Sequence, residues 1–222
     1  QFMLDNCETV NEIIESCSEV RISEVDYKFP IHFNTMDRNG GGAIFEFLNG
    51  NMLVYANEVN ASGVLSNSTF ENSLKQTEFI NCDSKNTHPT DLTNSIERFW
   101  KANQLVKKYK GEDVIKYSFS ILDAVFNNTQ WQIVYDISGL KIYYRTKSHK
   151  KIKTLDINDY DFLVRNTRFV DINEKPESKS SWKVFNASAA VEMINLICDR
   201  AKFIREVLGK EKMEIGSFYG SA

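Results

Sequence analysis

Two polar side chains of this sequence have the chemistry that acyl transfer needs. Asn67 follows the apolar pair Val64 and Leu65, where a strand would end, and Arg98 lies one turn into the helix predicted next. An asparagine amide can donate a hydrogen bond to a developing oxyanion, and a fixed guanidinium can hold a thiolate, carboxylate or substrate in place. Their positions alone identify no site, because a turn asparagine and a surface arginine are common in any fold.

The remaining polar residues form no recognisable catalytic or metal-binding pattern. The sequence has no P-loop, no dinucleotide-binding glycine pattern, no nucleophile elbow and no zinc-protease histidine pair. The histidines are scattered and the cysteines lack metal-ligand spacing; these residues are His32, His88, His149, Cys7, Cys17, Cys82 and Cys198. We therefore expect no metal and no cofactor, and we expect buried, unreactive thiols.

The elements that must position Asn67 and Arg98 follow from hydrophobic periodicity and turn residues. The segment 58–93 is polar and is predicted to be irregular. In chain order, the prediction is a helix over 1–20, strands over 29–36, 43–48 and 52–55, helices over 95–109 and 112–126, strands over 130–136, 140–146 and 151–156, and a helix over 187–208. This order predicts an α+β fold in which two antiparallel sheets pack face to face between helical layers.

Local signals add detail to this prediction. Asn49-Gly50 is a strong hairpin signal, and the short link Lys110-Gly111 predicts an antiparallel pair formed by the two central helices. The second helix of this pair is expected to place six apolar side chains inward: Val114, Ile115, Phe119, Leu122, Val125 and Phe126.

Composition limits the partners. The chain has 222 residues and a formal net charge of -3, which suits one domain with a sizeable core and argues against nucleic acid as a partner. No apolar run is long enough for a membrane span, and no secretion signal is visible, so we expect a soluble protein. The chain starts at Gln1 inside a helical pattern, so we also expect a segment to precede it.

Several blocks of sequence resemble one family when they are taken together. Gly63-Val-Leu-Ser-Asn-Ser-Thr-Phe70 resembles the V-(L/M)-T-N-x-P-x-F segment of the choloylglycine hydrolase and penicillin V acylase family. The other similar blocks are Pro30–Asp37 with Ala43–Glu46, Asn57-Glu58, Asn94–Phe99, Thr129–Asp136, Ile142–Thr146 and Ile152–Asp156. These blocks occur in the family order and cover about residues 1–162.

The resemblance implies an N-terminal-nucleophile αββα sandwich, incomplete here at its N-terminus, and hydrolysis of a linear amide bond in a small molecule. In the family, the first residue of the mature chain is a cysteine that attacks the amide while its own amine acts as the base. Asn67 matches the oxyanion asparagine and Arg98 the arginine beside the cysteine. The nucleophile is not in this chain, because Cys7 lies in a predicted helix, so the chain alone is expected to be inactive.

Some alternatives stay open. Residues 68–70 lack the proline of the family pattern, which leaves Asn67 favoured but not settled. Residues 163–222 are predicted to be a C-terminal extension with a helix near 187–208. A non-catalytic relative that binds an amide or lipid-like ligand, and an unrelated α+β binding module, remain as other readings. The sequence leaves open which amide is the substrate and whether the protein forms a homo-oligomer. It also leaves open whether the protein is cytoplasmic, periplasmic or secreted.

Overall fold

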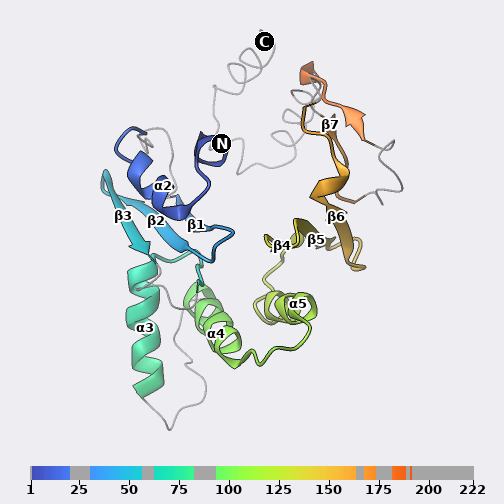
Figure 1. The fold of residues 1–222 in the computed structure, drawn as a ribbon. Helices are drawn as coiled ribbons and strands as arrows, with labels where there is room; N and C mark the ends of the chain where they lie inside the picture. The colour runs from blue at the N-terminus through green and yellow to red at the C-terminus, as the bar shows by residue number, and fades with distance from the viewer. Residues whose placement is uncertain are drawn as a thin grey trace.

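A computed structural model gives the arrangement of helices and strands (Figure 1). It describes residues 2–20, 31–56, 63–82, 94–163, 168–173, 182–188 and 191. The described helices are α1 (Phe2–Asn6), α2 (Val10–Ser16), α3 (Phe70–Cys82), α4 (Asn94–Lys108), α5 (Val114–Ala124) and the 3₁₀ turn η1 (Ile157–Asp159). The described strands are β1 (His32–Met36), β2 (Gly42–Leu48), β3 (Asn51–Ala56), β4 (Trp131–Asp136), β5 (Lys141–Thr146), β6 (Lys153–Asp156), β7 (Arg168–Phe169) and β8 (Lys183–Val184).

The first sheet is an antiparallel meander with the strand order β1-β2-β3. Asn49 and Gly50 join β2 to β3 with φ angles of 55° and 77°, and two positive φ angles in succession are what a type I′ hairpin turn requires. The predicted strands over 43–48 and 52–55 and the hairpin between them are confirmed.

The central strand β2 is buried on both faces because helices cover this sheet from both sides. On one face, α2 packs on a cluster that we call the α2-side cluster, formed by Val10, Ala43, Phe45 and Phe47 with Ile13, Ile14, Cys17 and Val54 around it. On the other face, α3 and α4 pack on the α4-side cluster, formed by Ile44, Phe70 and Phe99 with Tyr55, Val64, Leu65 and Leu74 around it. Successive side chains of a strand point to opposite faces, so β2 contributes to both clusters.

The N-terminal region forms two helices, so the predicted single helix over 1–20 is wrong. Thr9 begins α2 with a capping box, in which its hydroxyl accepts the N–H of Glu12 and the Glu12 carboxylate accepts the N–H of Thr9. The Asp37 carboxylate accepts the N–H of Val10 at 3.0 Å, which ties α2 to the turn between β1 and β2. Several backbone hydrogen bonds hold the pKa of Asp37 below its ordinary value, and the bond from Val10 has the largest effect.

A helix, α3, lies within the segment 58–93, which the sequence predicts to be irregular. Its inner face carries Ser73 and Thr77 next to Phe70, and all three are buried. The hydroxyls of Ser73 and Thr77 each donate to a backbone carbonyl one turn earlier, at 2.9 Å. Because these hydroxyls are satisfied within the helix, the face is buried without the apolar periodicity that predicts a helix.

The two central helices, α4 and α5, are confirmed and pack against each other. The hydroxyl of Tyr117 on α5 donates to the carbonyl of Leu105 on α4 at 2.7 Å. Val114 and Phe126 were expected to face inward, but each is 54% exposed. Val114 is the first residue of α5, and Phe126 lies two residues after its last residue.

The second sheet, with the strand order β4-β5-β6, confirms the three predicted strands over 130–136, 140–146 and 151–156. α5 packs against β4, and Phe119 of α5 lies under the guanidinium of Arg145 on β5. The mixed helix-and-sheet character is therefore confirmed. Face-to-face packing of the two sheets is not seen in the described ranges, where helices occupy both faces of the first sheet.

Most of the predicted C-terminal extension, including nearly all of the helix expected over 187–208, lies outside the described residues.

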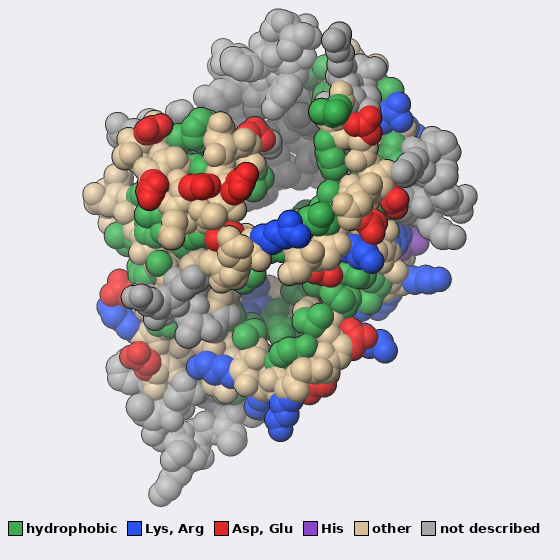
Figure 2. All heavy atoms as spheres, in the orientation of Figure 1, with side chains coloured by type: hydrophobic (Ala, Val, Ile, Leu, Met, Phe, Trp, Pro, Cys, Tyr) green, Lys and Arg blue, Asp and Glu red, His purple; other side chains and the backbone are tan. Residues whose placement is uncertain are grey.

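Figure 2 shows acidic side chains gathered over α1 and α2. The exposed acidic residues of this region are Asp5, Glu8, Glu12, Glu15 and Glu19. None of the described helices combines the length and the apolar character that crossing a bilayer demands.

Candidate functional site

The segment that carries Asn67 connects the first sheet to α3. At its start, the side chain of Asn34 on β1 donates to the carbonyl of Gly63 at 2.6 Å. Val64 and Leu65 then pack against the α4-side cluster. Residues 63–69 contain no strand, so the expectation that Asn67 follows the end of a strand is wrong, and side-chain bonds replace a strand ladder in fixing this segment.

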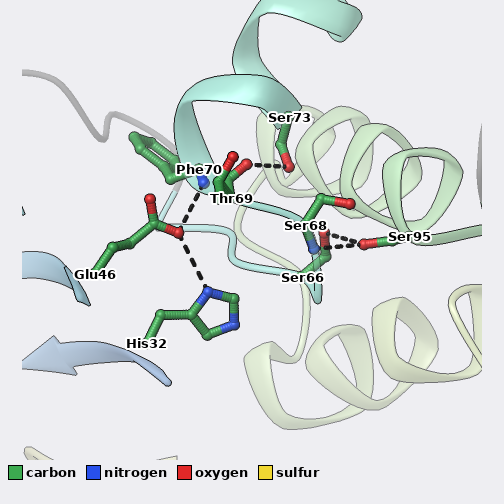
Figure 3. Close-up of polar contacts among 8 residues, drawn as sticks. All are labelled: His32, Glu46, Ser66, Ser68, Thr69, Phe70, Ser73 and Ser95. Atoms are coloured by element: carbon green, nitrogen blue, oxygen red, sulfur yellow. Dashed lines mark hydrogen bonds and ion pairs between the residues drawn. The ribbon is translucent and has the colours of Figure 1, made fainter. Parts of the chain in front are cut away.

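The middle of the segment is bound to the start of α4. The hydroxyls of Ser66 and Ser95 lie 3.0 Å apart, and the backbone N–H of Ser68 donates to the Ser95 hydroxyl at 2.8 Å (Figure 3). Asn67 lies between the two residues that are held in this way. One serine of α4 therefore holds the side chain before the predicted oxyanion asparagine and the backbone after it.

The end of the segment is fixed by a buried carboxylate. Glu46 reaches from β2 toward the first turn of α3, and its Oε1 accepts the backbone N–H of Phe70 at 2.9 Å (Figure 3). His32, its direct cross-strand neighbour on β1, has Nδ1 3.2 Å from the same oxygen. Glu46 is 1% exposed, and its other oxygen has no hydrogen-bond partner in the described part of the chain.

The side chain of Asn67 itself is exposed. It makes no hydrogen bond with any residue that the structure describes, although the backbone around it is anchored at three points. The amide donors of Asn67 are therefore available to a group that arrives from outside.

Arg98 lies one helical turn after Ser95 and is half-buried. Its Nε donates to the side-chain oxygen of Asn94 at 2.9 Å and to the Asn94 carbonyl at 3.3 Å. The side-chain oxygen of Asn94 also accepts from the amide of Asn127, beyond the end of α5, at 3.1 Å. The guanidinium is thus directed back toward the start of α4, where the Asn67 segment is bound.

The structure brings the two predicted site residues to the same region. The bond from the Ser68 N–H to Ser95 and the three-residue step from Ser95 to Arg98 limit the Cα–Cα distance between Asn67 and Arg98 to roughly 13 Å. Both residues therefore flank the N-terminal end of α4 on the side of the sheet that faces α3 and α4.

The cysteines with described side chains lie elsewhere. Cys7 follows α1, and Cys17 ends α2 in the α2-side cluster, on the opposite face of the first sheet from Asn67. Burial, and to a smaller extent Cys7, raise the pKa of the Cys17 thiol above its ordinary value, which disfavours the nucleophilic thiolate. No group of three or more potential metal ligands occurs among the described residues.

Two residues of this arrangement were given no role in the sequence analysis. Glu46 had a detectable signal, since a carboxylate within the apolar run Ala43–Leu48 must find partners if the strand is buried on both faces. Ser95 had no such signal, because a serine near the start of a helix is common and its contact with residues 66–68 depends on the tertiary fold.

Solved structures of amide hydrolases are similar to this chain. Penicillin V acylase from Agrobacterium tumefaciens matches with a TM-score of 0.64 and 17% identity, over 84% of this chain and 66% of that one. A mutant conjugated bile acid hydrolase from Clostridium perfringens matches with a TM-score of 0.58 and 18% identity, over 82% and 63% of the two chains. A variant of the same hydrolase matches with a TM-score of 0.55 and 18% identity, over 80% of this chain and 62% of that one.

These comparisons confirm the expected resemblance at the level of the fold. The chain spans less than two thirds of the length of each of these three proteins. No protein-family model and no curated protein matches the sequence.

Proposed function

We propose that this chain, which shares its fold with penicillin V acylase and conjugated bile acid hydrolase, is the C-terminal part of a cysteine amidase with an N-terminal nucleophile. The enzyme hydrolyses a linear, non-peptide C–N amide bond in a small molecule. Asn67 donates to the oxyanion of the tetrahedral intermediate, and Arg98 orients the nucleophilic cysteine. That cysteine belongs to chain outside these 222 residues, so the chain alone is inactive.

One observation carries this proposal. The Ser95 hydroxyl contacts both neighbours of Asn67, through the hydroxyl of Ser66 and the backbone N–H of Ser68, and Arg98 follows on the same helix one turn later. An oxyanion donor and a group beside the nucleophile have to converge on one reacting carbon, and a shared anchor at Ser95 supports such convergence. The exposed amide of Asn67 and the guanidinium of Arg98 are held on backbone that the α4-side cluster makes rigid.

The layered αββα arrangement is part of the same proposal. The similar proteins are longer than this chain, which covers 66% and 63% of two of them. We infer that further chain, N-terminal to Gln1, completes the layers and supplies the cysteine and the pocket loops that select the substrate.

The complete coding region provides the test. We expect it to encode a cysteine directly after the initiating methionine or after a signal peptide. The purified full-length protein should hydrolyse at least one member of a panel of linear amides, and a thiol-blocking reagent should abolish the activity. Asn67→Ala should lower kcat about 100- to 1,000-fold, the range for loss of one oxyanion donor, with KM little changed.

Asn72→Ala is the matched control, because Asn72 is also exposed and lies only five residues away, on the outside of α3. It should retain full kcat. An upstream sequence without an N-terminal cysteine, or an Asn67→Ala enzyme with wild-type kcat, would refute the catalytic assignment. A protein that binds amides without hydrolysing them and lacks the cysteine would instead be a non-catalytic relative that binds an amide or lipid-like ligand.

A further inference from the structure

A pocket of about 460 Å³ opens where α5 ends and the hairpin of β4 and β5 begins. Neither Asn67 nor Arg98 lines it. The side chains that line it include Asp123, Phe126, Trp131, Arg145, Lys147 and Lys150.

The charge of this pocket favours an anion. Asp123 is its one acidic side chain among these six, and it is already engaged, because its carboxylate accepts from Arg145 Nη2 and from Gln132 at 3.3 Å. Lys147 donates to the neutral side chain of Asn128 at 2.8 Å. Lys150 is exposed and makes no hydrogen bond with any described residue. With Asp123 neutralised by Arg145, both lysine charges remain available to a ligand.

Arg145 is held in position before any ligand arrives. Its guanidinium lies 4.8 Å from the centre of the Phe119 ring, its Nε donates to Gln132 at 2.6 Å, and its Nη2 binds Asp123. The side chain is only 19% exposed. These contacts leave Nη1 without a partner among the described residues. A guanidinium that is already ordered loses little rotamer entropy when it binds a carboxylate.

The walls of the pocket are aromatic. Phe126 is 54% exposed and Trp131 is 56% exposed, although both are large apolar side chains that proteins usually cover. Small-molecule sites combine such apolar walls with a few convergent polar groups that fix the orientation of the ligand. Here the aromatic walls lie beside three cationic side chains, so the pocket can contact both an apolar group and a negative charge on one ligand.

We propose that this pocket binds a small organic anion whose carboxylate faces Lys150 and Arg145 and whose planar apolar group packs against Trp131 and Phe126. The site does not depend on the amidase proposal, because none of its residues is assigned to the catalytic reaction. Binding can therefore be measured and can fail independently of hydrolysis.

The test is a titration of the purified protein with three small molecules. Benzoate carries a ring and a charge, benzamide keeps the ring without the charge, and acetate keeps the charge without the ring. Binding is followed by the indole N–H signal of Trp131 in ¹H–¹⁵N NMR spectra, assigned with Trp131→Phe. Benzoate should shift this signal saturably, and benzamide and acetate should each bind about tenfold more weakly, as expected when one of two roughly 1.4 kcal/mol contributions is lost.

Paired lysine variants separate the pocket from general surface charge. Lys150→Gln should weaken benzoate binding about fivefold, in keeping with the roughly 1 kcal/mol of a charge pair at a solvated rim. Lys151→Gln removes the same charge one residue further along, from a lysine that does not line the pocket, and should leave the affinity unchanged. Both lysines are exposed, so both variants should fold.

Three results would overturn the proposal. Benzoate could leave the Trp131 signal unshifted at millimolar concentration, benzamide could bind as well as benzoate, or Lys151→Gln could weaken binding as much as Lys150→Gln. Trp131→Leu, in which the aromatic wall is lost, should abolish benzoate binding measured by calorimetry, whereas Trp131→Phe should retain it.

Discussion

Glu46 offers a test of how the Asn67 segment is fixed, because its two oxygens have different surroundings. Oε1 accepts the N–H of Phe70 at 2.9 Å and lies 3.2 Å from Nδ1 of His32, whereas Oε2 is buried with no partner in the described part of the chain. Glu46→Ala removes the acceptor and leaves the buried N–H of Phe70 unpaired. Glu46→Gln can keep an oxygen in the place of Oε1.

The magnitudes follow from these contacts. An unpaired buried donor costs about 1–3 kcal/mol, and truncation of a side chain that is 1% exposed adds a small cavity. We expect Glu46→Ala to lower the free energy of unfolding by roughly 2–4 kcal/mol. Glu46→Gln should cost less than about 1 kcal/mol, since it retains one hydrogen bond and replaces an oxygen that had no partner with an amide group in the same position.

Urea unfolding followed by circular dichroism measures both changes, with Glu71→Gln on the exposed side of α3 as the control. Amide hydrogen exchange at Phe70 supplies a local readout, because Glu46→Ala should speed it while leaving exchange in α5 unchanged. If Glu46→Gln proves as destabilising as Glu46→Ala, the negative charge rather than the hydrogen bond to Phe70 is what matters, and the reasoning is wrong.

Two further predictions concern other parts of the fold. The hydrogen bond from Arg145, together with that from Gln132, holds the pKa of Asp123 below its ordinary value. The contribution of this pKa shift to the free energy of unfolding should be fully present above about pH 4, the ordinary pKa of an aspartate. It should be lost as the pH falls through the pKa of Asp123 in the folded protein. Asp123→Asn should therefore lower Tm near neutral pH but not at strongly acidic pH, and a constant difference in Tm from pH 2 to pH 6 would contradict this. Phe99 is fully buried against Ile44 and Phe70, so Phe99→Ala should cost about 3–5 kcal/mol in urea unfolding. The exposed Val114→Ala control should change stability by less than about 0.5 kcal/mol, and a similar cost for both variants would argue against the described core.

The elements of this fold that the sequence predicts correctly are those with regular apolar patterns. The hairpin at Asn49-Gly50 and the strands over 130–146 follow from alternation and turn chemistry alone. α3 was missed because Ser73 and Thr77 bury hydroxyls that bond within the helix, which leaves no apolar stripe to detect. The break between α1 and α2 was missed because an apolar stripe continues across it, although Thr9 and Glu12 carry a recognisable capping signal.

For the site, the sequence supplies the residue types but not their arrangement. Asn67 and Arg98 were selected by resemblance, and their common anchor at Ser95 is a tertiary contact between residues that are 27 positions apart. The role of Glu46 depends on which donors lie around it in the fold. Such contacts between distant segments leave no periodic trace in a single sequence.

The burial of β2 on both faces has a consequence for how this protein unfolds. Its alternate side chains belong to the α2-side cluster and to the α4-side cluster, so both clusters include residues of the same strand. Loosening α2 exposes Phe45 and Phe47 and weakens the strand on which Ile44 is held. We therefore expect the first sheet and the helices on its two sides to unfold as one cooperative unit, so that destabilisation near the N-terminus also reaches the segment that carries Asn67.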